Sequence, residues 1–133
     1  MGDYTELIFG AELKTDTPKE VIDILQYMCY RKTPRPTAFP NHILFSKPRW
    51  EILFSCSSYY FAVSEPMAKM WFDEISKSWK ISTRANIKNY DDEIGSFCDW
   101  IKPYIESGSG EQEFFAIECF EQGTPVIHKL GGY

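Results

Sequence analysis

Residues 7–28 combine a strand pattern with a helix pattern, and the rest of the chain is organised around them. Leu7, Phe9, Ala11 and Leu13 recur at every second position, which predicts one buried face of a β-strand. Apolar residues then recur three or four positions apart, which predicts an amphipathic helix. The stripe of this helix consists of Val21, Ile24, Leu25 and Met28. The region therefore predicts a strand, a polar turn and a helix that packs on a sheet.

The start of this helix has local signals of its own. Thr17 is a residue type that caps helices, Pro18 suits the first helical position, and Glu20 can complete a capping box with Thr17. We therefore expect the helix to begin at Thr17 or Pro18, with the Thr17 side chain as its cap.

A similar order of elements recurs in residues 85–101. A strand ending at Lys88 leads into a polar turn, and Asn89 or Asp91 is expected to cap a second helix. The apolar stripe of that helix consists of Ile94, Phe97, Cys98, Ile101 and Ile105, and Pro103 should bend or shorten its last turn. When this region is aligned with the first strand and helix, only three residues are identical. An internal duplication and two unrelated strand-helix pairs therefore stay equally open as interpretations.

Short apolar or alternating segments predict further antiparallel strands. These segments are residues 50–54, 59–63, 67–73, 79–88, 112–121 and 125–130. The third and fourth should pair as one hairpin, and the last two as another. In 79–88, Arg84 and Asn86 fall on the polar face. The prediction is a single α+β domain, 1–133, with a mainly antiparallel sheet, two helices packed on one face and two possible β-α units.

Residues 31–49 form a proline-rich arm or loop. Its four prolines forbid a continuous helix or central strand, and Arg31, Lys32 and Arg35 concentrate positive charge there. Apolar residues favour an arm pinned to the body of the domain over a disordered linker. These residues are Phe39, Ile43, Leu44 and Phe45. Residues 131–133 are expected to be a loose tail.

Composition and charge exclude several classes of protein. The chain has 133 residues, 44% hydrophobic content and a net charge of −5. This length and this apolar content are sufficient for one hydrophobic core. There is no basic tract for duplex nucleic acid, and no apolar run long enough to span a membrane. The N-terminal MGDYTEL does not have the pattern of a signal peptide. We expect a soluble, cytoplasmic protein without a membrane partner.

The residues that usually carry catalysis give few leads. The four cysteines are scattered without a C-x-x-C pair, which predicts no metal site and no disulfide. There is no phosphate loop or other catalytic motif, so we expect no cofactor. His128 could act as a general base with Glu118 or Glu121, although a solvated histidine is the simpler interpretation. The pattern favours binding over catalysis.

Aromatic residues are the strongest functional signal, because they make up 17% of the chain. A patch of Tyr, Trp and Arg is typical of a protein interface or a base-stacking platform. The predicted binding residues are Tyr59, Tyr60, Trp71, Trp79, Arg84 and Arg49. Two hypotheses follow. One is a module that binds or inhibits a host or bacterial protein, and the other is a binding or hydrolytic site where Arg84 and Arg49 hold the phosphate of a nucleotide-like ligand. The alternative is a sheet face covered by the arm.

Arg84 is the most specific element of this hypothesis. It lies on the polar face of the most regular predicted strand, beside Lys80 and Lys88. A guanidinium can pair with an anion bidentately while it stacks on an aromatic ring, which an ammonium cannot do. Arg84→Lys is therefore expected to leave folding nearly unchanged and to weaken binding.

Three segments carry a resemblance to other proteins: FGAELK-x-DTP-x-EVID, SSYYF and NIKNY-x-x-EI-x-x-F-x-DWIKPYI. From about Tyr4 to Leu130 the chain resembles a group of short hypothetical proteins of bacteria, phages and prophages. The resemblance carries over no activity, fold or catalytic residue. It implies a small accessory protein, related to phages or mobile elements, that binds a partner.

Overall fold

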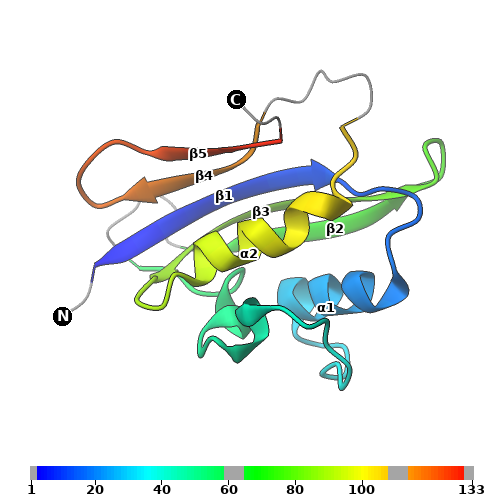
Figure 1. The fold of residues 1–133 in the computed structure, drawn as a ribbon, viewed down its shortest axis with the longest axis horizontal. Helices are drawn as coiled ribbons and strands as arrows, with labels where there is room; N and C mark the ends of the chain where they lie inside the picture. The colour runs from blue at the N-terminus through cyan, green and yellow to red at the C-terminus, as the bar shows by residue number, and fades with distance from the viewer. Residues whose placement is uncertain (1–2, 59–64, 108–113, 131–133) are drawn as a thin grey trace.

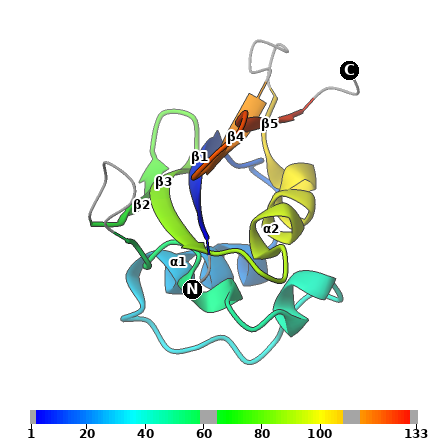
Figure 2. The ribbon, with the colours of Figure 1, turned by 90° about the vertical axis from the view of Figure 1, so that its left-hand side faces the viewer.

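A five-stranded antiparallel sheet forms the centre of the computed structural model, which describes residues 3–58, 65–107 and 114–130. The strands are β1 (Tyr4–Glu12), β2 (Met67–Asp73), β3 (Ser78–Lys88), β4 (Phe114–Phe120) and β5 (Val126–Lys129). Their order is β2-β3-β1-β4-β5. Helices α1 (Lys19–Tyr30) and α2 (Glu93–Ile101) cover one face of the sheet (Figures 1 and 2). The predicted α+β class is confirmed.

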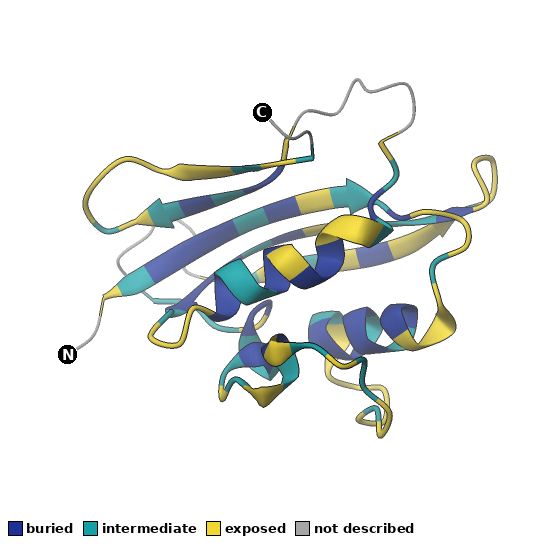
Figure 3. Cartoon of the chain, viewed as in Figure 1, coloured by how far each residue is buried: buried dark blue, intermediate teal, exposed yellow. Residues whose placement is uncertain are grey.

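The core lies between this sheet face and the two helices. Every residue of the two predicted helix stripes is buried, and the two stripes belong to one hydrophobic cluster with Leu7 and Phe9 of β1. Figure 3 shows buried residues along β1 and along the sides of the helices that face the sheet. Both strand-helix pairs therefore pack as the hydrophobic periodicity predicts, because each helix has one apolar side and the sheet offers it one apolar face.

The helix starts differ from the predicted ones in detail. Pro18 is the N-cap of α1 and no side chain caps it, because the Thr17 hydroxyl donates instead to the carbonyl of Lys14 at 2.6 Å. The predicted Thr17 cap is therefore wrong. The predicted N-cap residue of the second helix, Asn89 or Asp91, is also wrong, because Asp92 caps α2 by accepting a hydrogen bond from the Gly95 N–H. Helix α2 ends at Ile101, and a short 3-10 turn that contains the predicted helix breaker Pro103 follows it.

The predicted strand at residues 50–54 is wrong. A 3-10 helix, η2 (Trp50–Ile52), begins this segment, and turns follow it. Trp50, Leu53 and Phe54 are buried. Their spacing of three and four positions places them on one side of a helical turn, whereas a strand would have placed Trp50 and Leu53 on opposite faces. The predicted strand at 59–63 and the tail at 131–133 lie outside the described residues.

The arm packs against the helices and not against the opposite face of the sheet. The Phe39 and Phe45 rings contact Trp50 with centroids 5.4 and 5.2 Å apart, and Phe45 also contacts Trp100 of α2 at 5.1 Å. A 3-10 helix, η1 (Ile43–Ser46), buries Leu44 completely. The arm is pinned, as its apolar content predicts.

One carboxylate holds the arm to α1. Glu51 accepts a hydrogen bond from the Tyr27 hydroxyl at 2.7 Å and one from Arg35 Nε at 3.1 Å. The hydrogen bond from Arg35, and then the one from Tyr27, keep the pKa of Glu51 below its ordinary value. A carboxylate that is easier to ionise in the folded protein stabilises the fold at neutral pH.

We expect this contribution of Glu51 to disappear in acid. Because the folded pKa is the lower one, the stabilisation is complete above the unfolded pKa, about 4.3 for glutamate. It is lost as the pH falls through the folded pKa. Urea unfolding of the wild type and Glu51→Gln between pH 7 and pH 3 measures this effect. The wild type should be more stable at pH 7, and the difference should shrink toward pH 3. A difference independent of pH would contradict the assignment.

The outer face of the sheet, opposite the helices, is more buried than its polar residues predict. Asn86, predicted to be solvated, is 1% exposed. Its N–H donates to the carbonyl of Cys56 at 3.0 Å, because β2 does not extend that far along β3.

Among the described residues, no helix is long and apolar enough to cross a membrane.

Candidate functional site

The described members of the predicted binding set, Trp71, Trp79, Arg84 and Arg49, lie in different places of the fold. Trp71 pairs with Lys80, and Trp79 pairs with Phe72, in the β2-β3 register. Neighbouring positions of a strand point to opposite faces, so Trp71 lies on the outer face with Arg84, and Trp79 lies on the helix-covered face. Tyr59 and Tyr60 lie outside the described residues.

Arg84 has a partner within its own chain. Its Nε and Nη2 atoms donate to the two carboxylate oxygens of Glu6 at 3.0 and 3.2 Å, and Glu6 is 2% exposed. The hydrogen bond and the charge of Glu6 raise the pKa of Arg84 further. The bidentate geometry that the sequence assigned to an external anion is therefore used to neutralise a buried carboxylate.

Arg49 joins the arm to the start of α2. Its backbone N–H donates to Glu93 Oε2 at 3.0 Å, and its Nη1 donates to Asp91 Oδ2 at 3.2 Å. The guanidinium also lies over the Tyr90 ring, 5.1 Å from the centroid. These contacts tie Arg49 to the turn before α2 and to its first residue, whereas Arg84 pairs with Glu6 of β1.

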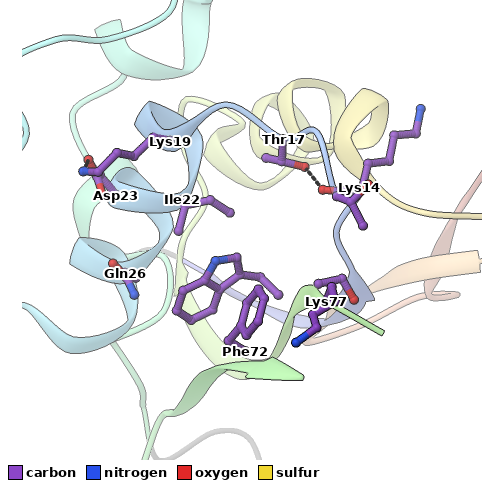
Figure 4. A pocket seen from close by; sticks show the side chains of 11 residues that line it. Lys14, Thr17, Lys19, Ile22, Asp23, Gln26, Phe72 and Lys77 are labelled. Atoms are coloured by element: carbon purple, nitrogen blue, oxygen red, sulfur yellow. Dashed lines mark hydrogen bonds and ion pairs between the residues drawn. The ribbon is translucent and has the colours of Figure 1, made fainter. Parts of the chain in front are cut away.

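Trp79 lines a cleft between α1 and the β2-β3 hairpin. Its ring meets that of Phe72 edge to face, with centroids 5.5 Å apart, and Phe72 is 39% exposed. The cleft has a volume of about 460 Å³ (Figure 4). The remaining lining residues are Lys14, Thr15, Thr17, Lys19, Ile22, Asp23, Gln26, Lys77 and Ser78. Two segments distant in sequence, residues 14–26 and 72–79, therefore build one aromatic cleft.

The rim of this cleft is positively charged, with three lysines and one aspartate. Lys19 pairs with Asp23 at 2.8 Å, and Lys77 pairs with Glu74 at 3.1 Å on the exposed hairpin turn. No carboxylate of the described residues forms an ion pair with Lys14. Figure 4 shows Lys14 extended away from the cleft and Lys19 turned toward Asp23. Exposed lysine side chains change rotamer within nanoseconds, so the rim can adjust to an anion.

A second group of polar residues lies near the other edge of the sheet. His128 Nε2 of β5 is 2.6 Å from Glu118 Oε1 of β4, so the structure selects the first of the two predicted carboxylate partners. His128 borders a cavity of about 480 Å³ that Cys98 and Lys102 also line. Burial, and then the charge of Glu118, raise the pKa of the Cys98 thiol. A protonated, buried thiol is a poor nucleophile.

The thiols are not joined in disulfides. All four cysteines are free, and burial raises the pKa of Cys29 to about 12. Within the described ranges, no three His, Cys, Asp or Glu side chains are grouped so that they could hold a metal ion.

Sequence reasoning identified Trp79 but missed its neighbours in the cleft. Phe72 and Lys77 flank the turn of the predicted hairpin, so the register of that hairpin could have placed Phe72 opposite Trp79. Lys14 comes from the turn before α1. No local signal links this turn to the hairpin, because they meet only through tertiary packing.

Comparison with protein-family models, curated protein sequences and solved structures finds no match for this chain. The resemblance to phage and bacterial proteins therefore stays a prediction.

Proposed function

We propose that this domain binds a small planar anion, of the nucleotide class, in the cleft between α1 and the β2-β3 hairpin. One observation carries the proposal: the partly exposed Phe72-Trp79 pair lines a cleft whose rim holds Lys14, Lys19 and Lys77. Aromatic side chains bind bases through their π faces, and stacking contributes about 1 to 3 kcal/mol per base. The ammonium groups of the rim lysines attract the negatively charged phosphate.

The size of the cleft supports the same class of ligand. Pockets for small molecules have volumes of about 300 to 1,000 Å³ and combine an apolar surface with a few polar groups. A cleft of about 460 Å³ falls within this range. Thr15, Thr17 and Ser78 add hydroxyl groups to its lining.

Binding of a partner protein through the aromatic sheet face, the other hypothesis from the sequence, has weaker support. Trp71 and Trp79 lie on opposite faces of the hairpin, and Arg84 is engaged by Glu6. A host or bacterial protein as partner stays a prediction, and the small-ligand function is the one that the geometry favours.

A thermal-shift series with AMP, adenosine and ribose 5-phosphate tests the proposal. AMP should raise the melting temperature most, because it alone offers both the base and the phosphate. A ligand at 100 times its dissociation constant stabilises a protein by about 2.7 kcal/mol. Quenching of tryptophan fluorescence should accompany AMP binding. Equal shifts with AMP and ribose 5-phosphate would contradict stacking, and no shift with any of the three would exclude the cleft as a nucleotide site.

Single substitutions at the rim locate the site. Lys77→Ala should weaken AMP binding about twofold to fivefold, since exposed charge pairs contribute up to about 1 kcal/mol. Phe72→Ala should weaken it by at least tenfold if the base stacks there. Lys69→Ala is the matched control, because Lys69 is an exposed lysine of β2 on the outer face. Equal effects of Lys69→Ala and Lys77→Ala would mean that the charge acts nonspecifically.

A further inference from the structure

Strand β2 forms one edge of the sheet. It pairs with β3 along its whole length, and no other strand of the described residues pairs with it. Edge strands present unpaired N–H and C=O groups that can pair with another chain, and natural proteins block such edges. At seven residues, β2 is longer than the other edge strand, β5, which has four.

The hydroxyl of Tyr30 occupies the middle of this edge. It donates to the carbonyl of Met70 at 2.9 Å and accepts from the N–H of the same residue at 2.9 Å. Both backbone groups of Met70 therefore point away from β3. Because these groups alternate along an antiparallel strand, those of Ala68 and Phe72 point away from β3 as well. Tyr30, the last residue of α1, thus blocks the central one of three outward-facing positions.

Exposed apolar side chains gather around this edge. The described residues include eleven large hydrophobic side chains that are exposed, and five of them lie on β2, on the turn that follows it, or at Tyr30. These five are Tyr30, Met67, Trp71, Phe72 and Ile75. A concentration of exposed apolar residues along a strand edge is typical of a surface that pairs with a further strand.

We infer that β2 pairs in antiparallel fashion with β2 of a second copy of this chain, and that the Tyr30 hydroxyl competes with this pairing. A twofold axis at Met70 places the three outward-facing positions of one copy opposite the three outward-facing positions of the other. Met70 then lies opposite Met70 of the second copy, and Ala68 lies opposite Phe72.

Complementary side chains support a second copy as the occupant. In this register Lys69 of one copy lies opposite Trp71 of the other, twice by symmetry. Within one chain, Lys69 Nζ already lies 5.2 Å from the centroid of the Trp71 ring, a distance typical of a cation-π contact. Cation-π pairs of this kind are attractive across strands as well.

The dimer of the wild-type chain should be weak. One pair of short strands buries less than the roughly 1,200 Å² at which stable interfaces begin. Formation of the dimer must also break both hydrogen bonds of Tyr30 to Met70. Removal of the hydroxyl alone should therefore tighten the dimer about tenfold or more, because the backbone groups of Met70 then have no competing partner.

Sedimentation velocity over a range of protein concentrations measures this effect. Tyr30→Phe keeps the ring and removes only the hydroxyl, and it should shift the midpoint of dimerisation to a concentration at least about ten times lower. Tyr90→Phe is the matched control, because Tyr90 is exposed and lies after β3, away from β2. This control should behave as the wild type does.

A charge exchange tests the register in the Tyr30→Phe background. Trp71→Lys places an ammonium opposite Lys69 of the second copy and should return the protein to a monomer. Addition of Lys69→Glu should restore the dimer through two opposite-charge pairs. A Tyr30→Phe variant that stays monomeric at every concentration, or a dimer that Trp71→Lys leaves intact, would overturn the inference. In the first case, a strand of a different protein would be the remaining occupant of the edge.

Discussion

Phe97→Ala should destabilise the domain more than any other single truncation discussed for this chain, by about 3 to 5 kcal/mol. Phe97 is fully buried on α2. Its ring meets Phe9 of β1 edge to face at 5.0 Å, and it meets Phe54 at 5.2 Å. Truncation would remove both ring contacts and leave a cavity where the sheet, α2 and the segment after η2 meet. These elements cannot all close over the gap, which adds a cavity term to the lost burial.

Urea unfolding monitored by circular dichroism measures this loss. The midpoint should fall while the slope with denaturant stays near that of the wild type, since the substitution leaves the exposed area on unfolding almost unchanged. Ile75→Ala is the control, because Ile75 is 96% exposed in the hairpin turn. It should change the stability by less than about 0.5 kcal/mol. Equal stability of the two variants would place the core elsewhere.

Arg84→Ala should cost about 3 kcal/mol, the second large effect. Loss of one partner from a buried ion pair costs about 3 to 5 kcal/mol, because the other charge stays buried without compensation. The lower end applies here, since the Arg84 side chain is 41% exposed and that of Glu6 is only 3% exposed. Arg84→Lys keeps the charge but not the bidentate geometry, and it should cost about 1 kcal/mol. The structure thus replaces the expectation that this substitution leaves folding unchanged.

Thermal and urea unfolding of both variants, beside Lys80→Ala, test this assignment. Lys80 pairs with Asp73 at 3.1 Å, and both side chains are about one third exposed. Such a pair contributes about 0 to 1 kcal/mol. The double variant Glu6→Leu/Arg84→Met should recover much of the stability lost in Arg84→Ala, because it leaves no buried charge unpaired. If Arg84→Ala and Lys80→Ala were equally mild, the burial of Glu6 would have no energetic role.

The elements that could be read from the sequence are those with a regular apolar period over eight or more residues. Helices α1 and α2 and the strands β1 and β3 all have such periods. The residues that these periods predict are buried, except that Ala11 and Trp79 are only partly buried. The hairpins β2-β3 and β4-β5 also form near their predicted bounds. Local periodicity suffices here because each element needs only one apolar side to find its place in the core.

Short apolar runs were ambiguous, since a segment of five residues fits a strand and a helical turn almost equally well. At residues 50–54 the packing of the arm on Trp50 decided the outcome in favour of the 3-10 turn. The cap of α1 also departed from its sequence signal, because the Thr17 hydroxyl found a carbonyl in the preceding turn. Competing partners of this kind lie outside the segment and cannot be read from it.

The α+β class and both helix stripes follow from the order of residues alone, as does an aromatic content that pointed to Trp79. Periodicity and composition are local properties, so they survive without knowledge of the fold. Tertiary structure alone decided which polar groups became partners. The β1-β3 register brought Glu6 to Arg84 across 78 positions of the chain, and the packing of α1 beside the hairpin joined Lys14, Phe72 and Trp79 in one cleft. Ion pairs and clefts depend on distances between segments, and these distances are set by the folded chain as a whole.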